Sequence, residues 1–178
     1  PNHPQHPEMG TRKLKFTREL YIDREDFAEV PPPKFFRMKP DGEVRLMGAY
    51  IVKCVGIDKN EDGTVKEIHV TADLESGCGN PVDGRKIKGT IHWLSAADCI
   101  DADVILYENM LTLEDSSKLP EGKEYADFLN PDSMKTLRAK LEPSLSLAKP
   151  GDKFQFVRTG YFCLDTKKPD TFNRTVTL

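Results

Sequence analysis

Long apolar runs are absent from this sequence, because no stretch approaches the roughly 18 apolar residues that a membrane-spanning helix requires. The chain also begins at Pro1 without a secretory leader pattern. Of its 178 residues, 38% are hydrophobic and 31% are charged, a balance typical of one globular domain or two small ones. The sequence therefore excludes a helical membrane protein and predicts a soluble chain with no membrane partner.

Cysteine is scarce, and its spacing excludes the common metal and redox motifs. The four cysteines lie at positions 54, 78, 99 and 163, and no two form a C-x-x-C pair. Cys54, Cys99 and Cys163 lie in apolar surroundings, which is typical of core thiols. A zinc site would need distant Cys and His residues to converge, so we expect no metal. Free thiols fit a reducing, cytoplasmic location.

Motifs that carry catalysis are missing as well. The sequence contains no P-loop, no G-x-G-x-x-G and no G-x-S-x-G. His69 and His92 stand alone within predicted strands, where a histidine is more often a packing residue than a catalyst. We therefore expect this chain to catalyse no reaction.

Short β-rich segments separated by Gly, Pro and Asp turns dominate what remains. Such a pattern is typical of an all-β fold, either barrels or a sandwich. Residues 58–63 join two strands as a hairpin. Strands are predicted at residues 13–17, 20–22, 45–55, 65–72, 86–93, 103–107, 153–158 and 161–165. Short helices are predicted at residues 23–29, 96–99, 125–129 and 134–138.

Two domains are predicted, residues 1–95 and residues 96–178. Residues 113–131 are acidic and poor in strand formers, so we expect a surface excursion with a small helix. The proline-rich start resembles an extended connector, and the chain stops inside a plausible strand, so we expect a piece of a longer protein. Its net charge of −3 argues mildly against a generic nucleic-acid binder. Charge is uneven, however: residues 98–132 hold ten acids and two bases, whereas residues 134–178 hold nine bases and four acids.

The pair of strands at residues 153–158 and 161–165 carries the strongest binding signal, with a turn at Thr159 and Gly160. Period-two alternation sends Phe154 and Phe156 to one face and Gln155 to the other. Arg158 is placed where the first strand enters the turn. Gln and Arg present paired hydrogen-bonding groups in a plane, which suits them to reading a base edge.

Other basic and aromatic segments leave two interpretations open. Residues 34–39 combine Lys, Phe and Arg, as RNA-loop readers do, yet either phenylalanine could instead plug a barrel end. Residues 83–88 form a basic turn that could touch phosphates or be a solvated hairpin tip. Trp93 is expected in the core. Arg174 could pair with acids of its own domain or of another one.

Several segments in a fixed order carry a resemblance that spans the chain. The sequence resembles the C-terminal, anticodon-binding half of the glutaminyl-tRNA synthetase family. This resemblance implies two related six-stranded β-barrels, of a kind also seen in a ribosomal protein, with strands that can be exchanged between them. The matching segments are PNHP at position 1, PEMG at 7, YIDR at 21, EVRL at 43, DGRK at 83, GTIHWLSAA at 89, EPSL at 142, YFCLD at 161 and FNRTV at 172.

The resemblance also implies roles for single residues. Gln155 and Arg158 match residues that contact the middle anticodon base, a uridine in glutamine tRNAs. Arg37, with Lys34 nearby, matches the pocket for the third base, although Phe36 stands where the family usually has Lys. Arg45 and Met47 match the two arginines around the first base; Met47 replaces the second of them.

The implied parent is an ATP-dependent ligase that attaches glutamine to tRNA-Gln, with ATP and Mg²⁺ in a catalytic domain, because the synthetase ATP-binding signatures are absent here. The expected partners are the anticodon loop of tRNA-Gln and that catalytic domain; we expect a monomer and no DNA. Two alternatives stay open: the similar domain of an archaeal or eukaryotic glutamyl-tRNA synthetase, and a free-standing rRNA-binding barrel. The Cys163-Leu164 pair favours the glutamine enzyme over the glutamyl one.

Overall fold

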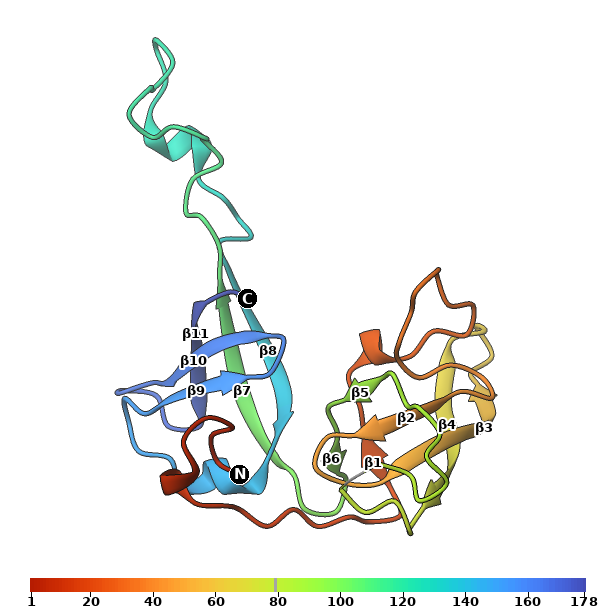
Figure 1. Ribbon diagram of the computed structural model, residues 1–178. Coiled ribbons are helices and arrows are strands. Elements are labelled where there is room, and N and C mark those ends of the chain that lie inside the picture. Colours follow the sequence, from red (N-terminus) through yellow and green to blue (C-terminus); the bar gives the residue numbers. More distant parts are fainter. Residues whose placement is uncertain (79) are drawn as a thin grey trace. The chain divides into compact units, whose positions relative to one another are not determined.

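The computed structural model describes residues 1–78 and 80–178, which divide into two compact units (Figure 1). Unit 1 comprises Pro1–Asp98 and unit 2 comprises Cys99–Leu178. This division lies three residues beyond the boundary expected near Ser95. The assignment of each unit as a separate domain, and any exchange of strands, stay predictions.

Unit 1 contains a four-stranded sheet and a two-stranded ribbon. The sheet has the order β4-β3-β2-β5, in which β2, β3 and β4 are antiparallel neighbours and β5 runs parallel to β2. The ribbon pairs β1 with β6. Two 3₁₀ turns, η1 and η2, complete the unit. The bounds are η1 Pro7–Met9, β1 Leu20–Tyr21, η2 Arg24–Asp26, β2 Glu43–Leu46, β3 Ile51–Lys59, β4 Val65–Asp73, β5 Thr90–Ile91 and β6 Leu94–Ser95.

The strand predicted at residues 45–55 is in fact the β2–β3 hairpin. The backbone NH of Ala49 donates to the carbonyl of Leu46 at 2.9 Å, and Gly48 between them has φ +67°. A left-handed backbone is easiest for glycine, so the chain reverses here although its hydrophobic pattern continues. The β3–β4 hairpin predicted at residues 58–63 is confirmed.

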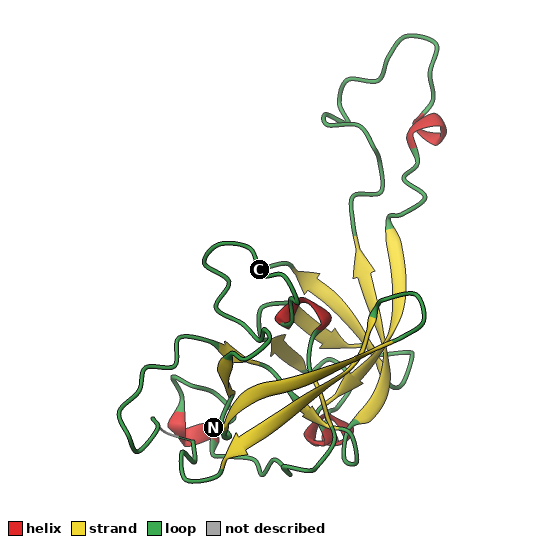
Figure 2. Ribbon diagram, turned by 90° about the vertical axis from the view of Figure 1, so that its right-hand side faces the viewer, coloured by secondary structure: helices red, strands yellow, loops and turns green. Residues whose placement is uncertain are grey.

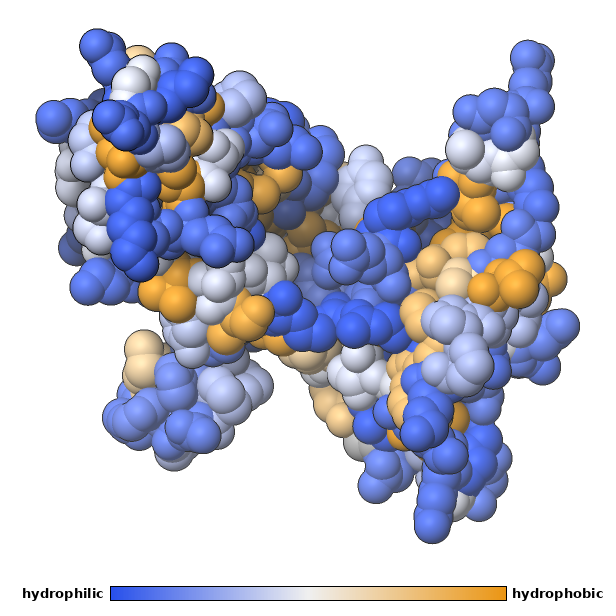
Figure 3. All heavy atoms as spheres, turned by 90° about the horizontal axis from the view of Figure 1, so that it is seen from above, coloured by the Kyte–Doolittle hydropathy of each residue, from blue (hydrophilic) through white to orange (hydrophobic). Residues whose placement is uncertain are grey.

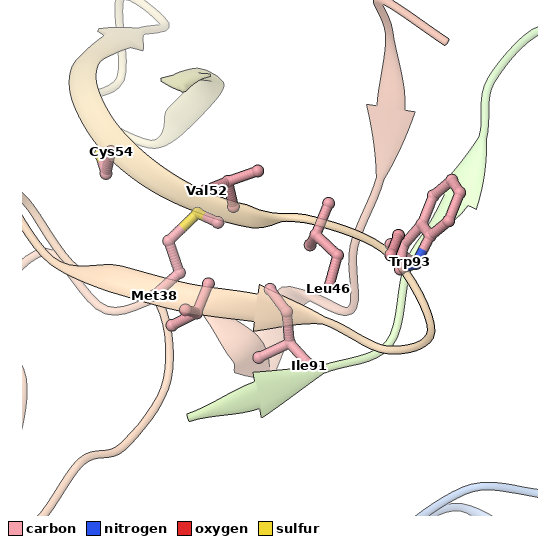
Figure 4. Close-up of a cluster of buried hydrophobic side chains, with 8 residues drawn as sticks. Met38, Leu46, Val52, Cys54, Ile91 and Trp93 are labelled. Carbon is pink, nitrogen blue, oxygen red and sulfur yellow. The ribbon is translucent and has the colours of Figure 1, made fainter. Parts of the chain in front are cut away.

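The core of unit 1 lies on one face of its sheet, and Figure 4 shows most of its members. Val44 and Leu46 from β2 meet Val52 and Cys54 from β3, and Ile91 from β5. Trp93, only 5% exposed, donates from its indole Nε1 to the carbonyl oxygen of Met47 at 3.0 Å. The predictions that Trp93 and Cys54 are core residues are confirmed.

Unit 2 is built on one five-stranded sheet with the order β8-β7-β11-β10-β9. Only the β11–β7 pairing is parallel. Phe162 and Phe172 are the largest fully buried side chains, and Phe156 stacks on Phe162 with ring centroids 4.3 Å apart. The bounds are β7 Ile100–Tyr107, η3 Tyr125–Phe128, β8 Met134–Leu141, η4 Pro143–Leu147, β9 Lys153–Phe156, β10 Gly160–Leu164 and β11 Thr171–Val176.

Residues 108–133 form an arm that extends from the ends of β7 and β8 (Figures 1 and 2). A single bridge between Leu111 and Leu129 and the 3₁₀ turn η3 are its regular features. Seven acidic side chains and two lysines lie along it. The predicted surface excursion with a small helix is therefore confirmed.

The all-β class is confirmed, because the described residues contain strands and short 3₁₀ turns but no α-helix (Figure 2). The prediction of closed six-stranded barrels is not met, since the described sheets have two, four and five strands and stay open. In unit 1, β1, β5 and β6 are only two residues long and offer few ladder hydrogen bonds for closure.

Several predicted elements were wrong. Residues 134–138 were expected in a helix but belong to β8, which pairs with β7 over eight residue pairs. Residues 96–99 form a turn, residues 13–17 form no strand, and only Thr90–Ile91 of residues 86–93 pairs as a strand. The helix expected at residues 23–29 shrinks to the single 3₁₀ turn η2. For residues 134–138, pairing along the whole length of β7 overrode a weak local helix propensity.

Hydrophilic side chains predominate on the face shown in Figure 3, with hydrophobic side chains among them. Val30 and Leu147 are among the most exposed large hydrophobic side chains of the described residues. Within the described part of the chain, no helix has the length and apolar character needed to cross a bilayer.

Candidate RNA-binding surfaces

The β9–β10 hairpin presents Gln155 as the sequence predicts. Phe154 and Phe156 pack toward the core of unit 2, and Gln155 between them is exposed on the opposite face. Its cross-strand partner is Tyr161, whose side chain is 43% exposed. Paired residues on antiparallel strands share a face, so an amide and an aromatic ring stand side by side on this surface.

Arg158 lies in the turn that follows β9, not on the strand itself. β9 ends at Phe156, whose carbonyl accepts a hydrogen bond from the NH of Thr159 at 2.9 Å. Arg158 is exposed and has φ +67°. The predicted turn at Thr159 and Gly160 thus begins earlier, at residue 157. A left-handed backbone is uncommon for arginine and often marks a functional turn.

Arg37 is anchored by a buried acid in unit 1. Its guanidinium forms an ion pair with Asp26, whose side chain is fully buried, while the Arg37 side chain is 38% exposed. Backbone hydrogen bonds fix the same segment, because the NH of Met38 donates to Asp26 at 2.9 Å and Met38 accepts from Ala28 at 3.1 Å. Arg37 can therefore present part of a held guanidinium to a ligand.

Lys34 and Phe36 lie on the surface beside this anchor. Lys34 is exposed and adopts φ +64°. Phe36 is 52% exposed, so it does not plug a barrel end; Phe35 is half-buried. The ammonium of Lys88 lies 5.4 Å from the centroid of the Phe36 ring, a cation–π contact. Aromatic and cationic groups of this kind suit contact with unstacked bases and phosphates.

Arg45 projects from β2 and is half-buried. Its Nη2 donates to Oδ1 of Asn80 at 2.9 Å. Its Nε atom is buried and has no hydrogen-bond partner among the described residues. Met47 follows β2; its backbone NH donates to the carbonyl of Ile91 at 3.0 Å, and its own carbonyl accepts from Trp93.

Arg85, which from the sequence could touch phosphates or belong to a solvated hairpin tip, proves to be a structural cation. Its guanidinium contacts Glu43 at 3.1 Å, Asp73 at 2.6 Å and Asp83 at 2.7 Å. Hydrogen bonds to Asp73 and then Asp83 raise the pKa of Arg85 above its ordinary value. Hydrogen bonds from the Arg85 backbone and side chain lower the pKa of Asp83. With three carboxylates around it, Arg85 is poorly suited to bind phosphate.

Arg174 also has a partner within its own unit, since its Nη2 contacts Glu108 at 2.7 Å. Of the predicted site residues, Lys34, Arg37, Arg45 and Met47 lie in unit 1, whereas Gln155 and Arg158 lie on one hairpin of unit 2. Their roles in RNA binding stay predictions.

Comparison with known families defines the class of protein. Two family models match, at residues 1–73 and 90–165, and both are described as the anticodon-binding domain of class I tRNA synthetases (E and Q). The chain belongs to this family of anticodon-binding domains. The resemblance seen in the sequence is thereby confirmed.

Curated relatives point to the glutamine branch. A glutamine–tRNA ligase of Xanthomonas axonopodis pv. citri (strain 306) is 46% identical over 181 residues, which cover 99% of this chain and 31% of that protein. The same name is carried by a relative from Clostridium perfringens, 46% identical over 99% of this chain and 32% of its own length. A third relative with this name, from Pseudomonas syringae pv. tomato, is 43% identical over 98% of this chain and 32% of its own length. This chain thus spans about a third of the relatives that it matches.

Proposed function

We propose that this chain recognises the anticodon loop of tRNA-Gln as part of an ATP-dependent glutamine–tRNA ligase. The exposed Gln155, on a hairpin held by the stacked Phe156 and Phe162, is the observation that carries the proposal beyond family membership. In this proposal the partners are tRNA-Gln and a catalytic domain of the same protein, the location is the cytoplasm, and the ligase acts as a monomer.

The middle base is assigned to unit 2. Uridine offers two carbonyl acceptors and one N–H donor on its pairing edge. The Gln155 amide both donates and accepts, and the Arg158 guanidinium donates to carbonyls. A good bidentate contact supplies about 1–3 kcal/mol of discrimination. These two side chains lie three positions apart on one hairpin, so they can address the same base.

The outer two bases are assigned to unit 1. Arg45 would contact the first base, with Met47 beside it where the family has a second arginine. Arg37 and Lys34 would contact the third base or its phosphate. The ion pair with Asp26 favours this role for Arg37, because a held guanidinium loses less conformational entropy on binding.

ATP and Mg²⁺ belong to the catalytic part of the proposed ligase. Among the described residues, no group of three or more His, Cys, Asp and Glu side chains is placed to hold a metal ion. In this proposal the chain contributes binding and positioning of RNA. Any effect on a distant active site must be a free-energy difference between two states of the ligase.

Binding of transcripts to this chain, measured by filter retention at low salt, tests the proposal. We expect tRNA-Gln to bind more tightly than tRNA-Glu, and a cytidine at the middle anticodon position to weaken binding by roughly 5- to 100-fold. Affinity should fall as the salt concentration rises, because basic side chains that bind RNA phosphates release counterions from them. Preference for tRNA-Glu would assign the chain to a glutamyl enzyme, and equal binding of unrelated RNAs would reject anticodon reading.

A further inference from the structure

The described residues of the β4–β5 loop, 74–78 and 80–89, make contacts on the face of the unit 1 sheet that carries Arg45. Arg45 of β2 is paired with Ile51 of β3, and Ile51 with Asp73 of β4, so the three side chains form one cross-strand row. Ile51 is only 1% exposed although it belongs to the face opposite the core residues Val44 and Val52. This face is therefore covered.

The first part of the loop is tied down through Asp73 and Ser76. Asp73 Oδ1 accepts the backbone NH groups of Glu75 and Ser76, each at 3.2 Å. The buried Ser76 hydroxyl accepts the NH of Ile51 at 3.1 Å and donates to the Asp73 carbonyl at 2.6 Å. The chain thus leaves β4 and turns directly onto the sheet.

The second part of the loop is tied down by Arg85. A turn closes where the NH of Gly84 donates to the carbonyl of Pro81 at 3.0 Å, and Pro81 is buried. Asp83 in that turn accepts both the backbone NH of Arg85 at 3.1 Å and its Nη1 at 2.7 Å. The same guanidinium reaches Asp73 and Glu43 on the sheet. Arg85 therefore joins the turn to two strands.

Asn80 lies immediately before this turn and holds Arg45. Glu43 and Arg45 are two residues apart on β2, so they share a face. Arg85 contacts the first of these and Asn80 the second. The Asn80 contact is the hydrogen bond that orients the guanidinium, because the buried Nε has no acceptor among the described residues.

We infer that Arg85 is a positioning residue for Arg45: it clamps the loop to β2 and β4 so that the Asn80 carboxamide aims the Arg45 guanidinium at the first anticodon base. The effect on base recognition rests on the proposed function, whereas the effect on Arg45 itself does not. Arg85 itself touches no RNA in this arrangement.

The order of the Arg45 side chain in this chain, measured by ¹⁵N relaxation of its Nε–Hε group, tests the clamp without RNA. The signal is assigned with an Arg45→Lys variant. In the wild type we expect a restrained group, and in Arg85→Gln we expect it to become as mobile as that of the exposed Arg18. The indole signal of Trp93 should keep its position, which shows that the core is intact. An Arg45 signal as restrained in Arg85→Gln as in the wild type would overturn the inference.

Base recognition is then measured as the ratio of affinities for tRNA-Gln transcripts with a pyrimidine or a purine at the first anticodon position. We expect Arg85→Gln to lower this ratio by about fivefold, the lower limit of one bidentate contact. In an Arg45→Ala background Arg85→Gln should change it no further, because the clamp acts through Arg45. If Arg85→Gln lowers the affinity ratio by the same factor in the wild-type and the Arg45→Ala backgrounds, the positioning role is overturned.

Lys59→Gln is the matched control. It removes one positive charge and one ion pair, with Glu29 at 2.6 Å, from the same unit. We expect both the Arg45 signal and the ratio to stay unchanged. If the Arg45 signal becomes mobile in Arg85→Gln but the ratio is unchanged in both Arg85→Gln and Arg45→Ala, the clamp is supported and the assignment of Arg45 to the first base fails instead.

Discussion

Arg37 and Asp26 form an ion pair in which the carboxylate is fully buried and the guanidinium is partly exposed. The pair ties the segment that carries Lys34 and Phe36 to the turn η2. Arg37 thus has a structural task as well as its proposed contact with the third anticodon base. The ion pair with Asp26 requires a positive charge, whereas the proposed base contact requires the planar guanidinium. A substitution that keeps only the charge therefore separates the two tasks.

Arg37→Ala should lower the free energy of unfolding of this chain by about 2 kcal/mol, because the buried carboxylate of Asp26 loses its charged hydrogen bond to Arg37. Arg37→Lys keeps the charge and loses the planar fork, so it should recover most of the stability but little of the third-base preference. Urea denaturation and transcript binding measure the two effects. Equal third-base preference in the wild type and Arg37→Lys would contradict the proposed contact.

Gln155→Ala should reduce the preference for uridine at the middle anticodon position by roughly 5- to 100-fold while leaving the unfolding midpoint unchanged. The side chain is exposed, so its loss opens no cavity. Phe154 and Phe156 keep their places on the other face. Lys153→Ala, on the same face two residues earlier, is the control; it should weaken all transcripts alike.

Arg158→Asn separates the backbone of the hairpin turn from its guanidinium. Asparagine tolerates the left-handed conformation that Arg158 adopts at φ +67°, so the turn should persist. We expect the preference for uridine at the middle position to fall as it does in Gln155→Ala. The Gln155→Ala/Arg158→Asn double variant should lose less binding free energy than the two single variants lose together. Transcript binding by the single and double variants measures this; additive losses would mean that the two residues act on different groups.

Asp165 should make unit 2 sensitive to acid. A hydrogen bond from Asn173, with further ones from the backbone of Lys167 and Lys168, lowers the pKa of Asp165 to about 2. Since the folded pKa lies below the ordinary value of 3.8, the group stabilises the fold above that value and loses this effect as the pH falls toward 2. The stability difference between the wild type and Asn173→Ala, measured by thermal unfolding, should therefore be largest near neutral pH and shrink as the pH falls from about 4 toward 2. A constant difference down to pH 2 would contradict the assignment.

Gly89→Ala should disrupt unit 1 without any change in charge. A Cβ at Gly89 would lie 2.2 Å from the carbonyl oxygen of Phe36 and 3.2 Å from Cγ1 of Val44, so backbone must move. Overpacking of this kind costs about 3 kcal/mol. Gly56→Ala, where the nearest atom is a His69 side-chain carbon at 3.4 Å, is the matched control. Urea unfolding followed by the fluorescence of Trp93, the only tryptophan, compares them.

Local patterns in the sequence predicted the β9–β10 hairpin. Alternation over residues 153–164 placed Phe154 inside and Gln155 outside, because side chains on a strand alternate whatever the rest of the chain does. Predictions failed where pairing with distant residues decides the outcome. Residues 134–138 have a helix-compatible composition, yet they add to the edge of β7 as part of β8. From the sequence Arg85 could be a phosphate ligand or part of a solvated hairpin tip, because its carboxylate partners Glu43 and Asp73 lie on strands that only folding brings beside it.

The sequence by itself determined the all-β class, the family and the alternation that exposes Gln155, since these depend on residue types and on neighbours a few positions apart. Only the tertiary structure decided which arginines are held and by what. Arg37 meets Asp26 across 11 positions, and Arg85 meets Glu43 across 42. Ion pairs form between groups that folding brings within about 4 Å, and no local pattern specifies such a partner.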